Sequence, residues 1–154
     1  MTLLIESLDL AFSNKTIVKN ICLCVNPGEV VGLLGPNGAG KTSTFNMIVG
    51  LIKPNKGNIY LDGVSIKNFS MTKRVQLGIG YLAQEPSIFR NLTVIENLDI
   101  ALSQSCLTRT LFREKREELI EEFNLFGFLD RYGYQLSGGE RRRCEVARAL
   151  AVGR

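Results

Sequence analysis

The residues with the clearest chemical potential lie between Gly35 and Thr42, in the order Gly-Pro-Asn-Gly-Ala-Gly-Lys-Thr. Gly35, Gly40, Lys41 and Thr42 fit the spacing G-x-x-x-x-G-K-[ST], which is typical of a phosphate-binding loop. Glycines let such a loop wrap a polyphosphate with its own backbone N–H groups, because no side chain stands in the way. The sequence therefore predicts that this loop binds a nucleotide.

Two side chains of the loop are expected to contact the ligand. Lys41 would reach the β- and γ-phosphates as a point charge and serve catalysis, and the Thr42 hydroxyl would ligate Mg²⁺. A chance Lys-Thr pair in a glycine-rich turn is the alternative, but the apolar run before the loop and the helical pattern after it are the context that the motif requires. The nucleotide-binding residues predicted here are Gly35, Pro36, Asn37, Gly38, Ala39, Gly40, Lys41, Thr42 and Ser43.

A second candidate site is Ser137-Gly138-Gly139-Glu140, which begins a helix expected to run through Leu150. Ser137 and Glu140 form a capping box, the two glycines permit close backbone approach, and the helix dipole favours a γ-phosphate. A plain capping box would explain Ser137 and Glu140 without any ligand. Both interpretations are compatible, because a capped helix end is also an anion site.

The composition is typical of one soluble globular domain: 154 residues, 45% hydrophobic and 22% charged. The net charge of +4 is mild and suits an anionic ligand, but it does not favour nucleic acid as a partner. The lack of histidine and of C-x-x-C spacing argues against a zinc site. The cysteines are expected to behave as small apolar residues of a reducing cytoplasm, and they are Cys22, Cys24, Cys106 and Cys144.

The N-terminal ten residues lack the basic start and apolar centre of a signal peptide. No stretch approaches the roughly 20 apolar residues of a membrane span. We therefore expect any membrane role to come through a partner.

Hydrophobic periodicity and turn residues predict strands followed by helices, which indicates an α/β core with a helical subdomain. The apolar stripe of the helix expected over residues 111–126, from Phe112 to Phe126, is expected to lie in the core. Strands are predicted over residues 3–10, 17–25, 29–34, 58–61, 64–66 and 78–83, and helices over residues 43–49, 71–76, 94–102, 111–126 and from 138 onward.

The sequence Leu-Ser-Gly-Gly-Glu at residues 136–140, about a hundred residues after the phosphate loop, makes the chain resemble ATP-binding cassette (ABC) ATPases over essentially its whole length. The resemblance implies a P-loop NTPase core with a mixed sheet at residues 1–85, a helical subdomain at 86–136, and a signature motif with its helix at 137–154. It also implies ATP and Mg²⁺ as cofactors. Nucleotide-binding subunits of this family pair as a homodimer in which the phosphate loop of one faces the L-S-G-G motif of the other.

The same resemblance assigns roles to residues outside the two motifs. Phe12 stands where the family places an aromatic ring, usually Tyr, that stacks on adenine; simple strand packing is the alternative. Gln84 matches the glutamine that contacts Mg²⁺ or the attacking water and senses the transporter partner. Ile88, Phe89 and Leu92 would either line a groove for a helix of that partner or belong to the core of the helical subdomain.

Within the family, residues 84–90 (Gln-Glu-Pro-Ser-Ile-Phe-Arg) and 138–143 (Gly-Gly-Glu-Arg-Arg-Arg) look closest to the ATPase subunits of bacterial lipopolysaccharide exporters. ATPase subunits of branched-chain amino acid importers share the phosphate loop but resemble the middle of the chain less. The resemblance therefore implies ATP hydrolysis coupled to export of lipopolysaccharide. It further implies transmembrane permease subunits as partners and a cytoplasmic location, peripheral at the inner face of the cytoplasmic membrane.

The chain departs from the family pattern in one respect. No apolar strand ends in Asp-Glu, and there is no histidine to act as the family's switch residue. We therefore expect a domain that is incomplete at its C-terminus, folds marginally, and binds ATP with very slow turnover. A nucleotide-binding remnant without hydrolytic activity is one alternative, and a soluble ABC-type ATPase without a membrane partner is another.

Overall fold

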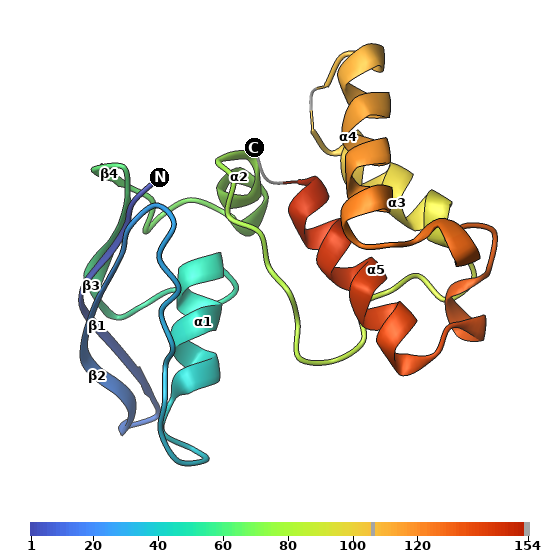
Figure 1. The fold of residues 1–154 in the computed structure, drawn as a ribbon. Helices are drawn as coiled ribbons and strands as arrows, with labels where there is room; N and C mark the ends of the chain where they lie inside the picture. Colours follow the sequence, from blue (N-terminus) through green and yellow to red (C-terminus); the bar gives the residue numbers. More distant parts are fainter. Residues whose placement is uncertain (106, 153–154) are drawn as a thin grey trace. The chain divides into compact units, whose positions relative to one another are not determined.

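A computed structural model of the chain describes residues 1–105 and 107–152. The chain divides into two compact units, Met1–Arg74 and Val75–Arg154. Figure 1 follows the chain through both. Each unit has its own buried apolar residues.

The first unit is built on an antiparallel sheet. Its described strands are β1 (Leu3–Phe12), β2 (Lys15–Val25), β3 (Lys56–Leu61) and β4 (Val64–Ser65), in the spatial order β2-β1-β3-β4. β1 pairs antiparallel with both β2 and β3, so its backbone finds hydrogen-bond partners along both edges. The buried face of the sheet is formed by Ile5, Leu8, Leu10, Val18, Ile59 and Leu61.

One helix, α1 (Lys41–Val49), covers this sheet (Figure 1). It ends where the sequence predicts, at Gly50, which adopts the left-handed conformation (φ 89°) and donates its N–H to the carbonyl oxygen of Asn46 at 3.1 Å. The helix buries Thr44, Met47, Ile48 and Val49.

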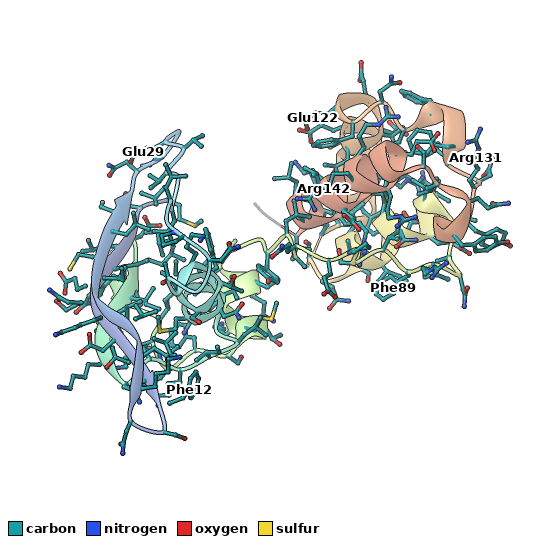
Figure 2. All side chains as sticks on the ribbon, turned by 90° about the horizontal axis from the view of Figure 1, so that it is seen from below. Phe12, Glu29, Phe89, Glu122, Arg131 and Arg142 are labelled. Carbon is teal, nitrogen blue, oxygen red and sulfur yellow. The ribbon has the colours of Figure 1, made fainter. Side chains whose placement is uncertain are left out.

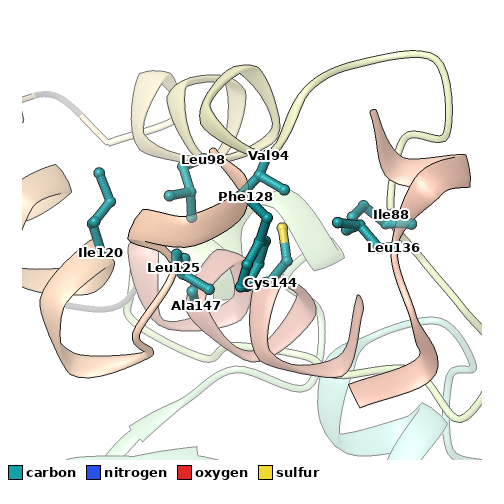
Figure 3. Close-up of a cluster of buried hydrophobic side chains, with 9 residues drawn as sticks. All are labelled: Ile88, Val94, Leu98, Ile120, Leu125, Phe128, Leu136, Cys144 and Ala147. Carbon is teal, nitrogen blue, oxygen red and sulfur yellow. The ribbon is translucent and has the colours of Figure 1, made fainter. Parts of the chain in front are cut away.

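The second unit is helical after α2 (Met71–Gln76), which spans the boundary between the units. Its helices are α3 (Val94–Ser103), α4 (Arg109–Glu122) and α5 (Gly138–Ala151). Single 3-10 turns lie at Phe126–Phe128 and Gly133–Gln135, and the sequence pattern did not indicate either of them. Figure 3 shows the main apolar cluster between these elements, formed by Ile88, Val94, Leu98, Ile120, Leu125, Phe128, Leu136, Cys144 and Ala147.

Two predicted strands are wrong. Residues 29–34 and 78–83 are not strands in the structure. A strand exists only where a neighbour accepts and donates its backbone hydrogen bonds, and no described strand pairs with either segment. Val30 and Leu34 are accordingly 97% and 93% exposed, although their apolar pattern predicted burial.

The fourth predicted helix ends earlier than expected. It stops at Glu122, because Asn124 takes a positive φ of 48° and the N–H of Leu125 turns back to the carbonyl oxygen of Ile120. Phe126 is exposed rather than part of the core, whereas Leu119 and Ile120 are buried as predicted.

The cysteines do not share one environment. Cys144 is buried as predicted, and burial raises the pKa of its thiol to about 11. Cys22 and Cys24 are exposed on β2, so the prediction that they behave as small apolar residues is wrong for these two. Cys106 lies outside the described residues. In the part of the chain that the structure describes, no helix has both the length and the apolar character needed to cross a membrane.

Candidate functional site

The turn into α1 depends on Gly40. This residue has φ 85° and precedes the helix without a side-chain capping bond. A Cβ atom at Gly40 would lie 2.7 Å from the carbonyl oxygen of Ile17 and 2.8 Å from Cγ2 of Val18. Glycine is therefore required twice here, for the backbone conformation and for the close packing of the loop on β2.

The N-terminal end of α1 presents unpaired backbone donors. The first bond of the helix joins the N–H of Thr44 to the carbonyl oxygen of Gly40 at 2.9 Å. The N–H groups of Lys41, Thr42 and Ser43 precede that bond, so the helix offers them no acceptor. No acidic residue lies in the first turn. The helix end therefore suits an anion such as a phosphate.

The Lys41 ammonium lies over the loop in this structure. Its Nζ atom donates to the carbonyl oxygens of Gly35 at 2.6 Å and Pro36 at 2.7 Å. The loop closes on itself through the N–H of Ala39, which donates to the carbonyl oxygen of Pro36 at 3.2 Å. Residues 35–39 are all exposed, as is Thr42. A phosphate bound at this helix end would thus lie near the Lys41 ammonium, which the carbonyl oxygens of Gly35 and Pro36 hold at the loop.

Phe12 ends β1, opposite Lys15 of β2, and the residue is 53% exposed (Figure 2). Packing within the sheet therefore leaves about half of this residue accessible. Adenine stacking and strand packing therefore both remain predictions for Phe12.

Gln84 is exposed, in a loop of the second unit that has no regular secondary structure. Of the three apolar residues that follow it, Ile88 is buried in the main cluster and therefore belongs to the core. Phe89 remains 46% exposed, with the guanidinium of Arg148 at 4.6 Å from the centre of its ring. Leu92 is half-buried.

The helix α5 begins with the predicted capping box. The hydroxyl of Ser137 accepts the N–H of Glu140 at 3.3 Å, and the carboxylate of Glu140 accepts the N–H of Ser137 at 2.8 Å. The Ser137 N–H, and next its hydroxyl, lower the pKa of Glu140. Gly138 and Gly139 are exposed, and a Cβ at either would meet nothing within 4 Å. The backbone at this helix end is open to a ligand.

The comparison with known protein families decides what these motifs belong to. The profile of the family described as "ABC transporter" matches residues 18–154. The chain belongs to the ABC transporter family.

Curated relatives share this ABC sequence at high identity. The "lipopolysaccharide export system ATP-binding protein LptB" of Haemophilus influenzae is 53% identical over 148 residues, which cover 96% of this chain and 61% of the relative. The protein of the same name from Escherichia coli K12 is 47% identical over 152 residues, covering 98% of this chain and 63% of the relative. The chain thus spans about three fifths of the length of the curated relatives it matches.

Solved structures confirm the ABC fold. A structure of the ATP-binding subunit of an ABC transporter superposes with a TM-score of 0.85 at 26% identity, over 99% of this chain and 62% of the other. An ATP-binding cassette of an ABC transporter in its ADP conformation gives the same score at 28% identity, over 99% and 65%. The predicted fold class is therefore confirmed.

The predicted site residues of this ABC domain fall into both units. Phe12 and residues 35–43 belong to the first, and Gln84 and residues 137–140 belong to the second. Among the described residues, no group of three His, Cys, Asp or Glu side chains is placed to hold a metal ion. Thr42 of the first unit and Gln84 of the second each remain predicted Mg²⁺ ligands.

Sequence reasoning missed three residues of the second unit that contact the loop after Gln84. Asn97 of α3 and Glu145 of α5 are both buried, and Arg148 of α5 is half-buried. The available signal was a polar residue within an apolar helix face, since Asn97 adjoins Leu98 and lies between Val94 and Ala101. Such a residue is buried at a cost unless it forms hydrogen bonds.

Proposed function

We propose that this chain is the ATP-binding part of an ABC transporter subunit that couples ATP binding and hydrolysis to export, and that the exported substrate is lipopolysaccharide. The observation that carries the proposal is the open N-terminal end of α1, with Lys41 and Thr42 beside it. The 53% identity to an ATP-binding protein named for lipopolysaccharide export supports the substrate.

In this proposal the phosphate loop binds ATP through backbone N–H groups of residues 35–43. Lys41 exchanges its two carbonyl acceptors for oxygens of the β- and γ-phosphates, which attract its charge more strongly. The exposed ring of Phe12 stacks on the adenine. A bound Mg²⁺ ion would neutralise phosphate charge, with the Thr42 hydroxyl as its ligand in the first unit.

Two such subunits pair so that the signature residues 137–140 of one bind the γ-phosphate held by the other. The capping box already orients the N-terminal N–H groups of α5, and its exposed glycines permit close approach. The nucleotide then lies between two helix N-termini. Transmembrane permease subunits convert closure of the pair into transport, which locates the subunit at the inner face of the cytoplasmic membrane.

Co-purification tests the partners and the substrate together. The tagged native protein is isolated from solubilised membranes of its source, and the co-purifying proteins are identified by mass spectrometry. We expect permease subunits, and we expect depletion of the protein to leave lipopolysaccharide in the inner membrane. Recovery of amino acid permeases with unchanged lipopolysaccharide transport would contradict the substrate, and recovery of no membrane protein would contradict the coupling.

Hydrolysis is tested on the same complex. We expect Mg²⁺-dependent release of phosphate from ATP that is lost in Lys41→Ala. Tight ATP binding without phosphate release would favour a nucleotide-binding module instead of an ATPase.

A further inference from the structure

Two buried polar side chains of the second unit contact the loop that carries Gln84. Asn97 comes from α3 and Glu145 from α5, and they are 0% and 4% exposed. Burying an amide or a carboxylate costs free energy unless its hydrogen bonds are satisfied. Their partners therefore show what these residues are placed to do.

Asn97 binds the backbone of Phe89 at both of its polar groups. Its Oδ1 accepts the Phe89 N–H at 3.0 Å, and its Nδ2 donates to the Phe89 carbonyl oxygen at 3.1 Å. The same Nδ2 donates to the carbonyl oxygens of Leu92 at 3.3 Å and Thr93 at 2.9 Å. The side chain of Asn97 thus supplies to Phe89 the two backbone hydrogen bonds that a neighbouring β-strand would supply.

Two side chains of α5 bind both backbone groups of Ser87, its N–H and its carbonyl oxygen. Glu145 accepts the Ser87 N–H at 2.8 Å through Oε1, and Arg148 donates to the Ser87 carbonyl oxygen at 2.6 Å through Nη1. Arg142, labelled in Figure 2, donates to the other Glu145 oxygen at 3.4 Å and to the Ala83 carbonyl oxygen at 3.3 Å. The loop is thus bonded to α5 on both sides of Gln84.

These bonds replace secondary structure. The loop over residues 84–90 belongs to no helix or strand, so side chains from α3 and α5 determine its path. A buried carboxylate is a costly way to gain stability, since apolar residues of similar size often serve as well. A specific loop conformation explains why polar groups occupy these two buried positions.

We propose that Asn97 and Glu145 are positioning residues, which fix the loop over residues 84–90 to α3 and α5 and so present Gln84 and Phe89 in one conformation. The expected effect on ATP hydrolysis rests on the proposed function. The claim that these two residues hold the loop in one conformation does not depend on nucleotide. Through Glu145, the loop is bonded directly to the signature helix α5.

Amide hydrogen exchange resolved by residue tests the structural claim. In Asn97→Leu, we expect the Phe89 N–H to exchange at least about tenfold faster, and in Glu145→Leu the Ser87 N–H, since each loses its acceptor. Glu145→Gln keeps an acceptor oxygen and should restore protection. Asn91→Leu, at an exposed position of the same region, is the matched control.

Unchanged exchange rates of the Ser87 and Phe89 amides in these variants would overturn the proposal. Faster exchange spread evenly over the second unit would also overturn it, because it would indicate a general loss of stability. If Asn97→Leu does not fold, Asn97→Ser removes the same bonds with a smaller change in polarity and gives the same two outcomes.

Steady-state kinetics of the full-length subunit in its membrane complex test the functional claim. We expect Glu145→Leu to lower kcat at least about tenfold while the KM for ATP changes less than about twofold. Glu145 positions the loop that carries Gln84, whereas the phosphate loop, which is proposed to bind ATP, is a different segment. Glu145→Gln should recover kcat. A raised KM with unchanged kcat would overturn the assignment. A wild-type complex without ATPase activity would contradict the proposed function, while the exchange result would still decide the structural claim.

Discussion

The guanidinium of Arg74 on α2 donates from Nη1 to the carbonyl oxygen of Met47 at 2.8 Å, across 27 positions of sequence. Met47 lies in the last turn of α1, and the same Nη1 also binds the carbonyl oxygen of Ile48. The Arg74 side chain is 1% exposed, and burial lowers its pKa. A cation at this end complements the negative pole of α1, whose opposite end is the candidate phosphate site.

Replacing Arg74 should therefore destabilise the first unit. We expect Arg74→Met to lower the free energy of unfolding by about 3 kcal/mol, because buried carbonyl oxygens lose a charged donor. Urea denaturation measures the loss. Lys73→Met, at the exposed neighbouring position, should change it by less than about 0.5 kcal/mol. Equal effects of the two substitutions would show that Arg74 does not support α1.

Gly40 and Gly63 form a matched pair, with φ values of 85° and 79°. Alanine at either costs about 1 kcal/mol for the left-handed conformation, but only at Gly40 does the new Cβ collide with the backbone of Ile17. We expect Gly40→Ala to destabilise more than Gly63→Ala and to weaken ATP binding. Equal stability losses would contradict the tight packing of the loop on β2.

Ser137 and Thr93 are also matched, since each closes a capping box with a glutamate three residues later. We expect Ser137→Ala and Thr93→Ala each to cost about 1 kcal/mol in denaturation experiments. Only Ser137→Ala should reduce the ATPase rate of the assembled transporter. A similar rate reduction in both variants would assign Ser137 a capping role alone.

The capping box at Glu140 should make stability depend on pH. The bonds from Ser137 lower the folded-state pKa of Glu140 below its ordinary value of 4.5. The box therefore contributes its full stabilisation above that value, and the contribution is lost as pH falls through the lower folded-state pKa. Glu140→Gln keeps the capping geometry without titrating. We expect it to flatten the acid side of the denaturation profile, and an unchanged profile would refute the contribution.

Local signals in the sequence predicted much of this structure. Thr93 and Ser137 marked two helix starts, and Gly50 marked a helix end, because a cap depends on residues a few positions apart. Residues 29–34 and 78–83 were predicted as strands and are not, because strand formation depends on a partner that the segment itself does not specify.

The candidate site also has features that the sequence predicted and features that it did not. Glycine spacing identified the phosphate loop, because the geometry of this loop depends on residues close together in the sequence. The bonds of Asn97 to Phe89 and of Glu145 to Ser87 join residues 8 and 58 positions apart. Arg74 reaches α1 over a similarly non-local separation. A sequence pattern can indicate that such residues are buried, but their partners follow only from the fold.

The most direct test of the account is titration of the protein with ATP and Mg²⁺ by isothermal calorimetry, in wild type, Lys41→Ala and the exposed-site control Lys19→Ala. We predict saturable binding that weakens at least about tenfold in Lys41→Ala and stays unchanged in Lys19→Ala, because a charged donor to phosphate is lost only in the first. Thermal denaturation of all three verifies that they are folded. Absent binding in folded wild type, or equal binding in folded Lys41→Ala, would contradict a nucleotide site at this loop.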